Sequence, residues 1–355
     1  MKILAVQNRM GIGDTVIFLP YIQAISKKFN KPVSLLVKRN SKADLFLNHT
    51  NYIDKIIFLE RNKQRNSQHN GILGSLKLAK DLKKNNFDKI FIFNSSLRFN
   101  LIARLAGIKD IIQYPLFRKY KQHITQPAIK LIKQNLDVDV NTNPEIQISQ
   151  KSIKDTITKY NIQKDQLNIL LGIGGSGPTK RIPSKTFLSV IKRINIKKNS
   201  KFFLATGKSD EEQIILNEIM NSEFKEKCIA LDDLTIAETL PIIKNCNVSI
   251  CNDTSFSHLS SALGIKTITL MADTPLIYGS YSSIMYPIIP DGETSVSHAT
   301  LGKDKINPEK IYNQLMSIIS LEISLRTISF AWLTNIDNLP VSGDISGCIF
   351  FCILI

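Results

Sequence analysis

Residues 2–29, KILAVQNRMGIGDTVIFLPYIQAISKKF, join a short apolar run, a glycine turn and a longer apolar-periodic stretch. The run over residues 2–7 predicts a buried strand. Apolar side chains recur at helical spacing over residues 15–29, which predicts a helix with one face toward a core. A strand that passes through a glycine turn into a helix is typical of an α/β fold with a parallel sheet.

The same alternation continues along the chain. Further strands are expected at residues 33–37, 56–59, 89–93, 166–173, 201–205, 248–251 and 267–271. Helices are expected at residues 73–84, 99–106, 152–160, 185–194, 211–220, 236–244, 256–263 and 307–319. A break at residues 138–144, VDVNTNP, separates the two runs. We therefore expect two similar α/β domains, residues 1–150 and 151–320, which face a cleft. Residues 321–355 form a nearly uncharged tail to which the sequence assigns no role.

The composition is that of a folded protein, with 43% hydrophobic and 21% charged residues among 355. This balance excludes wholesale disorder. No apolar run reaches the ~18–20 residues of a membrane-spanning helix, and the first residues lack the features of a secretory signal. The five cysteines form no CxxC pair and have no zinc-like His spacing, so we expect reduced thiols, no metal site and a cytoplasmic location.

The net charge of +16 is unevenly distributed. Residues 1–150 hold 25 Lys and Arg against 10 Asp and Glu, a net +15, whereas residues 151–355 hold 21 against 20, a net +1. One interpretation is a lysine-rich, solvated surface without a ligand. The other is that the first half meets an anionic partner, such as a nucleic acid, a phosphorylated glycan or a membrane face.

Three short segments carry candidate chemistry. The turn Gly11-Ile12-Gly13-Asp14 lacks the sixth-position small residue of a dinucleotide fingerprint, because Val16 stands there. Asp14 is then either an ordinary carboxylate at a helix start or a carboxylate that faces the cleft.

The second segment is the loop at residues 172–181, GIGGSGPTKR, which follows a predicted strand. Its glycines, hydroxyls and cations suit phosphate binding, although a flexible surface turn would have a similar composition. In the third segment, residues 248–263, a strand runs through Asn-Asp-Thr-Ser into a helix whose start favours anions. His258 lies one turn into that helix, as either a structural or a ligand-binding side chain.

In this order and spacing, the three segments resemble glycosyltransferase family 9, the ADP-heptose:lipopolysaccharide heptosyltransferases. Residues 11–20 are similar to the family's GxGDxxxxxP pattern, and residues 86–114 resemble its second landmark. Residues 174–183, GGSGPTKRIP, resemble the nucleotide loop. Residues 252–264, NDTSFSHLSSALG, resemble the DTGxxHxxAALG signature, with Ser255 in place of its glycine.

The resemblance, which covers about residues 1–320, implies a GT-B fold. In that fold two Rossmann-like domains with parallel sheets face a cleft, the first binding the acceptor and the second the nucleotide-sugar. It implies that Asp14 is the catalytic base. It places the nucleotide-sugar against Ser176, Lys180, Glu211, Asp253, Thr254, Ser255 and His258. It implies neither a cofactor nor a metal.

The activity expected from this resemblance is inverting transfer of a heptose from ADP-heptose to a lipopolysaccharide-type acceptor. The charge split adds an anionic glycolipid acceptor and peripheral contact with the inner membrane surface. The sequence has no nucleic-acid-binding motif with interleaved aromatic residues, so we expect no nucleic-acid partner. The acceptor residues that we expect are Arg61, Lys63, Arg65 and Arg98, with Arg118, Lys119 and Lys121 beside them. Two alternatives stay open: a catalytically silent nucleotide-sugar or glycan-binding protein, and another GT-B enzyme such as an epimerase.

Overall fold

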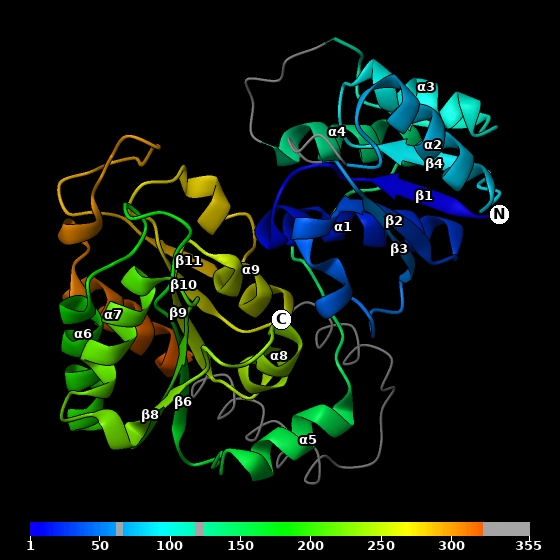
Figure 1. Cartoon of the computed structure of the whole chain (residues 1–355). Coiled ribbons are helices and arrows are strands. Elements are labelled where there is room, and N and C mark those ends of the chain that lie inside the picture. Colours follow the sequence, from blue (N-terminus) through cyan, green and yellow to red (C-terminus); the bar gives the residue numbers. More distant parts are fainter. Residues whose placement is uncertain (62–66, 118–123, 322–355) are drawn as a thin grey trace, which may run out of the picture. The chain divides into compact units, whose positions relative to one another are not determined.

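The computed structural model describes residues 1–61, 67–117 and 124–321. Residues 1–312 form one compact unit that holds both sheets (Figure 1). Residues 313–321, which belong to a second unit, are helical. No helix of the described ranges is long and apolar enough to cross a membrane.

The first half of the chain builds a five-stranded sheet in the order β3-β2-β1-β4-β5, with every neighbouring pair parallel. Its strands are β1 (Ile3–Val6), β2 (Val33–Lys38), β3 (Ile53–Leu59), β4 (Lys89–Ile92) and β5 (Asp110–Gln113). Its helices are α1 (Ile12–Phe29), α2 (Gly71–Lys83), α3 (Leu97–Leu105) and α4 (Thr125–Leu136), with short 3₁₀ turns η1 (Arg39–Ser41) and η2 (Ala43–Leu45).

The second half builds a six-stranded parallel sheet in the order β11-β10-β9-β6-β7-β8. Its strands are β6 (Leu167–Gly172), β7 (Ser200–Ala205), β8 (Cys228–Ala230), β9 (Val248–Asn252), β10 (Thr267–Leu270) and β11 (Met285–Ile288). Its helices are α5 (Gln150–Lys159), α6 (Ser184–Lys197), α7 (Asp210–Met220), α8 (Ile236–Lys244) and α9 (Ser255–Ala262), with 3₁₀ turns η3 (Lys225–Lys227), η4 (Leu276–Gly279) and η5 (Lys303–Lys305).

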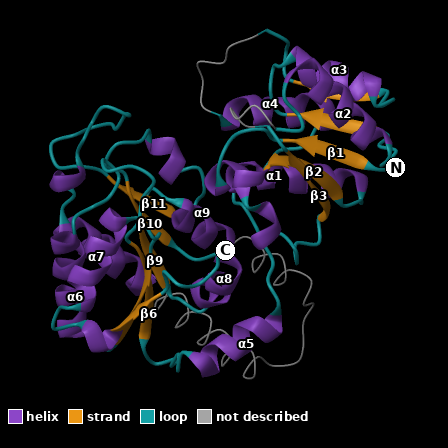
Figure 2. Cartoon of the chain, viewed as in Figure 1, coloured by secondary structure: helices purple, strands orange, loops and turns teal. Residues whose placement is uncertain are grey.

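Both sheets therefore have the strand order of doubly wound folds, and helices flank them (Figure 2). In each half the order reverses beside the first strand: between β1 and β4 in the first sheet, and between β6 and β9 in the second. Ligands of such folds bind outside the carboxyl ends of the strands at this switch point. The loops that follow β1, β6 and β9 are consequently the expected site, and they are the three segments that the sequence singles out.

One shared core fixes these loops against one another. Helix α1 is buried on nearly all sides, from Ile12 to Ser26, because it packs against both its own half and α9 of the other half. The connection between the halves is also anchored, since the backbone N–H of Ile146 donates to the backbone oxygen of Ala262 at the end of α9. The starts of α1 and α9 are thereby held at the same cleft.

Candidate active site

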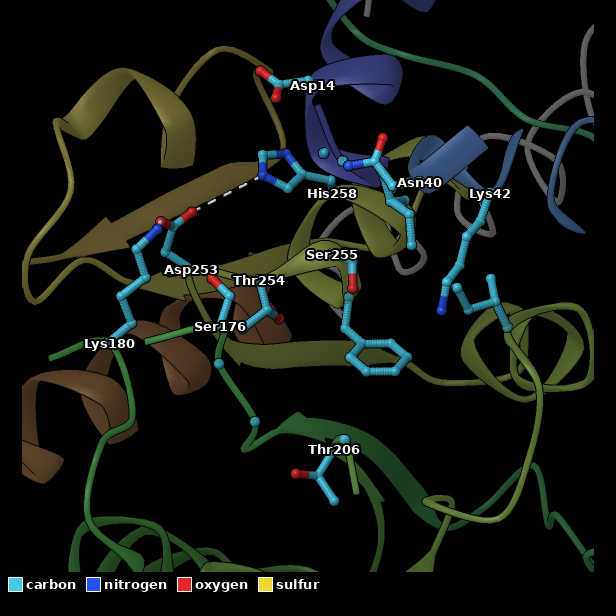
Figure 3. A pocket seen from close by; sticks show the side chains of 18 of the residues that line it. Asp14, Asn40, Lys42, Ser176, Lys180, Thr206, Asp253, Thr254, Ser255 and His258 are labelled. Atoms are coloured by element: carbon cyan, nitrogen blue, oxygen red, sulfur yellow. Dashed lines mark hydrogen bonds and ion pairs between the residues drawn. The ribbon is translucent and has the colours of Figure 1, made fainter. Parts of the chain in front are cut away.

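A cavity of about 860 Å³ lies between the carboxyl ends of the two sheets (Figure 3). The first half lines it with residues 9–14 after β1 and with residues of η1 and η2 after β2. The second half lines it with the loops after β6, β7 and β9. Seven of the predicted site residues are in this lining: Asp14, Ser176, Lys180, Asp253, Thr254, Ser255 and His258.

Asp14 lies in the first turn of α1, where a carboxylate suits the positive end of the helix. Arg9 Nε donates to Asp14 Oδ1 at 3.1 Å, and Gln7 Nε2 donates to the backbone oxygen of Asp14 at 3.0 Å. Burial raises the pKa of the Asp14 carboxyl above its usual value, although the charges of Arg9 and Lys180 oppose that rise. Lys180 belongs to the opposite wall of the cavity, so its charge acts on Asp14 across the cavity.

On the opposite wall, a lysine and a buried carboxylate form an ion pair. Lys180 Nζ donates to Asp253 Oδ2 at 2.7 Å. Burial would raise the pKa of Asp253, but the charge and hydrogen bond of Lys180, together with smaller contributions from His258 and Thr274, hold the pKa below its usual value. Figure 3 shows the other side of the same carboxylate facing His258, whose Nε2 is 3.9 Å from Oδ1.

His258 is a neutral, buried part of this wall. Burial lowers the pKa of the imidazole to about 4, so the ring is uncharged near neutral pH. Its Nδ1 shares a 2.9 Å hydrogen bond with the hydroxyl of Tyr281, whose ring stacks on the imidazole. The tautomer with the proton on Nε2 suits both neighbours, because Tyr281 can then donate to Nδ1 while the Nε2 proton faces Asp253.

Gly13 of the first half packs directly against this ring. A Cβ at position 13 would lie 2.5 Å from His258 Cδ2 and 2.7 Å from Nε2, closer than real contacts allow. The second glycine of the Gly11-Ile12-Gly13-Asp14 turn is therefore needed for the close approach of α9. This contact explains why a glycine and a histidine 245 positions apart both belong to the site.

Gly13→Ala is expected to lower the free energy of unfolding by about 1–3 kcal/mol through overpacking against His258, and to reduce turnover, because the Asp14 loop must shift. Thermal unfolding and turnover measured on the same preparation test this. Gly177→Ala is the matched control for stability, because a Cβ there meets nothing within 4 Å. Equal stability of the two variants would contradict the proposed contact.

The start of α9 offers an anion-binding site beside Lys180. Thr254 is the N-cap residue in extended conformation, and its side chain makes no capping hydrogen bond. Its buried Oγ1 finds no partner within the described part of the chain, and neither does Oγ1 of Thr206 across the cavity. Free helix N–H groups, unpaired hydroxyls and a lysine together suit the oxygens of a phosphate.

The predicted site residue Glu211 does not line the cavity, whereas the next residue, Glu212, does. Glu211 is 67% exposed and lies 3.7 Å from Arg181, outside the cavity lining. Glu212 lines the cavity instead, where Oε1 accepts from the backbone N–H of Gly175 at 2.9 Å and Oε2 accepts from the Ser209 hydroxyl. The backbone of Gly174 and Gly207 approaches this carboxylate too closely for any Cβ. Glu212 thus contacts the loops after β6 and β7, both of which line the cavity on the side of the second half.

The two predicted acceptor residues that the structure describes, Arg61 and Arg98, are not in the cavity lining. Arg61 follows β3 and Arg98 lies in the first turn of α3, both at the carboxyl edge of the first sheet. The Arg98 guanidinium donates to the backbone oxygen of His69, and burial together with the nearby Arg61 lowers its pKa. Lys63, Arg65, Arg118, Lys119 and Lys121 lie outside the described residues.

Several lining residues were not predicted from the sequence. They include Arg9, Asn40 and Lys42 in the first half and Thr206, Glu212 and Tyr278 in the second. Only Glu212 had a local signal, since Ser209 and Glu212 have the spacing of a capping box at the start of α7. In the described ranges, no group of three or more His, Cys, Asp or Glu side chains is placed to hold a metal ion.

Two doubly wound sheets whose switch-point loops face a common cavity define a GT-B glycosyltransferase fold. The chain belongs to glycosyltransferase family 9 (heptosyltransferase), whose family model matches residues 75–283. The expected fold and family are thereby confirmed.

Relatives with known names or structures are similar to this chain over most of its length. The lipopolysaccharide heptosyltransferase 1 of Campylobacter coli is 21% identical over 324 residues, which are 84% of this chain and 92% of that protein. A family 9 glycosyltransferase structure from Veillonella parvula superposes with a TM-score of 0.72 at 16% identity, covering 89% of this chain and 96% of that one. The E. coli ADP-heptose heptosyltransferase II structure gives a TM-score of 0.66 at 17% identity, covering 91% and 99%.

Proposed function

We propose that this chain transfers a heptose from ADP-heptose to the core of a lipopolysaccharide-type acceptor, with inversion at the anomeric carbon. The observation that carries the proposal is one cavity with a carboxylate on one wall and an anion site on the other. Asp14 belongs to the first wall, and Lys180 with the start of α9 belongs to the second. The similarity to a lipopolysaccharide heptosyltransferase 1 and to an ADP-heptose heptosyltransferase II supports this choice of substrates.

Asp14 is suited to the role of general base. Its carboxylate accepts the proton of the acceptor hydroxyl while that oxygen attacks the anomeric carbon from the side opposite the diphosphate. The new carbon–oxygen bond forms as the bond to the diphosphate breaks, so the configuration inverts. Burial raises the pKa of Asp14, which makes the carboxylate a stronger base than a solvated aspartate.

The second wall is suited to the leaving group. Negative charge grows on the nucleoside diphosphate as the sugar departs, and a preorganised cation and helix N-terminus stabilise such charge. Lys180 is already held in place by Asp253, and the N–H groups of α9 begin at Ser255. Neutral His258 completes this wall without adding a charge.

The two domains divide the substrates between them. Residues 151–320 supply the donor loops, and residues 1–150 supply Asp14 and the basic edge that includes Arg61 and Arg98. A donor diphosphate alone does not account for a first half with a net charge of +15. We assign that charge to an anionic acceptor.

The acceptor KM should rise steeply with salt while the donor KM changes less, because exposed charges are screened over ~8–10 Å at physiological ionic strength. Replacing Arg61, Lys63 and Arg65 together by Ser should mimic high salt for the acceptor only. The matched control replaces three exposed lysines of the second half, Lys164, Lys185 and Lys192, and removes the same charge. If the acceptor KM did not change with salt, the excess positive charge of the first half would reflect its amino-acid composition and not acceptor binding.

Incubation with a panel of nucleotide-sugars and a lipopolysaccharide core acceptor tests the activity itself. We expect nucleoside diphosphate release that requires both substrates, highest with ADP-heptose, and a product of inverted anomeric configuration by NMR. Donor binding without release would support the silent binding protein. A changed donor sugar without any acceptor would support an epimerase.

A further inference from the structure

Six large apolar side chains lie exposed on two neighbouring helices of the first half. Ile72 and Leu73 at the start of α2 are 82% and 81% exposed. The complete set, here called the α2–α3 face, comprises Ile72, Leu73, Leu76, Leu97, Leu101 and Leu105. By contrast, α6 and α7 of the second half each carry one exposed residue of this kind, Ile196 and Ile214.

The core does not need these side chains. Helix α2 already buries Leu78, Ala79 and Leu82 against the first sheet, and α3 buries Phe99, Ile102 and Ala103. Leu97, Leu101 and Leu105 recur every four residues, so they form a second stripe on α3 that faces away from the core. Helices α2 and α3 pack against each other (Figure 1), so these exposed side chains lie on two adjacent helices. Large apolar side chains that gather exposed on neighbouring helices are typical of an interaction site.

Cations accompany the α2–α3 face. Helices α2 and α3 together carry five Lys and Arg and a single acidic residue, Asp81. Lys80 and Lys83 are exposed on the same outward side of α2 as Leu76. Apolar side chains interleaved with cations are typical of surfaces that lie on a membrane interface.

We propose that the α2–α3 face docks on an anionic lipid bilayer. Its leucines and isoleucine enter the boundary between headgroups and acyl chains, and the exposed Lys80 and Lys83 beside them meet the lipid phosphates. A second copy of the chain is the weaker occupant, because a symmetric dimer through this face would juxtapose two surfaces of like charge.

This inference rests on and deepens the proposed function. A lipid-anchored acceptor reaches the enzyme only at a membrane surface, and α3 carries both the docking residues and Arg98. The helix follows β4, so its first residues lie at the same carboxyl edge of the first sheet as the loop of Asp14. Docking by this face would bring the acceptor edge to the bilayer.

Flotation of the full chain with vesicles tests the proposal through lipid binding. We expect binding to phosphatidylglycerol-containing vesicles and little binding to pure phosphatidylcholine. The variant Ile72→Ser with Leu73→Ser and Leu101→Ser should bind the anionic vesicles at least tenfold more weakly. Ile196→Ser with Ile214→Ser, which removes exposed apolar side chains from the other half, should bind like the wild type. Both variants should keep wild-type turnover with a delipidated, water-soluble acceptor.

Other outcomes overturn the proposal. Vesicle binding that is unchanged in the α2–α3 variant would place the lipid contact elsewhere in the chain. Absence of vesicle binding, combined with concentration-dependent self-association that the variant abolishes, would make a second copy the occupant. Because the readout is lipid binding, it stands apart from the activity test: an inactive protein that docks would refute the proposed function alone.

Discussion

Replacing Asp14 by Asn should lower turnover by ~10²-fold or more while leaving affinity for the nucleoside diphosphate unchanged. The amide keeps the size of the side chain and its contact with Arg9 but cannot take a proton from the acceptor. Affinity should persist because the donor loops belong to the other half of the chain. Single-turnover kinetics and calorimetry with the diphosphate separate the two effects.

The pH dependence of kcat/KM tests the role of Asp14 independently. Burial raises the pKa of Asp14, and the base acts only when ionised, so kcat/KM should fall as the pH drops through that raised value. The Asn variant should keep its residual activity without this acidic limb. Asp44→Asn, at a nearby exposed aspartate of η2, is the matched control and should behave like the wild type. If the Asp14→Asn variant turned over like the wild type, Asp14 would not be the base and would serve only as a carboxylate at the N-terminus of the helix.

The central strands could be predicted because burial on both faces imposes continuous apolar runs. The expected first strand at residues 2–7 corresponds to β1 (Ile3–Val6), and the run at residues 166–173 corresponds to β6. Strands β5, β8 and β11 had no such signal. They are three or four residues long and lie at the edges of their sheets, and β11 contains Pro287. Short, half-exposed edge strands carry little periodicity.

Those site residues that lie in the segments after strands could be predicted from the sequence. Asp14, Lys180 and Asp253 lie in the segments that follow β1, β6 and β9, and the topology of a parallel sheet brings the ends of those strands to one edge. The contacts that hold these residues in place could not be predicted. The contact of Gly13 with His258 and the hydrogen bond of Tyr281 join distant positions through packing alone.

The Lys180→Ala variant should lose affinity for the nucleoside diphosphate by about 10- to 100-fold, the value of one charge-assisted hydrogen bond. It should also be less stable by about 3 kcal/mol, because Asp253 is left as a buried and unpaired carboxylate. Without the lysine, burial dominates and the pKa of Asp253 should rise above its usual value. The stability deficit should therefore shrink as the pH falls through that raised pKa and protonation removes the charge.

The double variant Lys180→Ala with Asp253→Asn separates binding from folding. A neutral amide at position 253 no longer needs a counter-charge, so unfolding by urea at neutral pH should show most of the lost stability restored. Calorimetry should show that diphosphate affinity stays low, because the cation that would meet the phosphates is still missing. If the double variant recovered affinity as well as stability, the lysine would serve only to neutralise Asp253, and the donor phosphates would be held by the start of α9 alone.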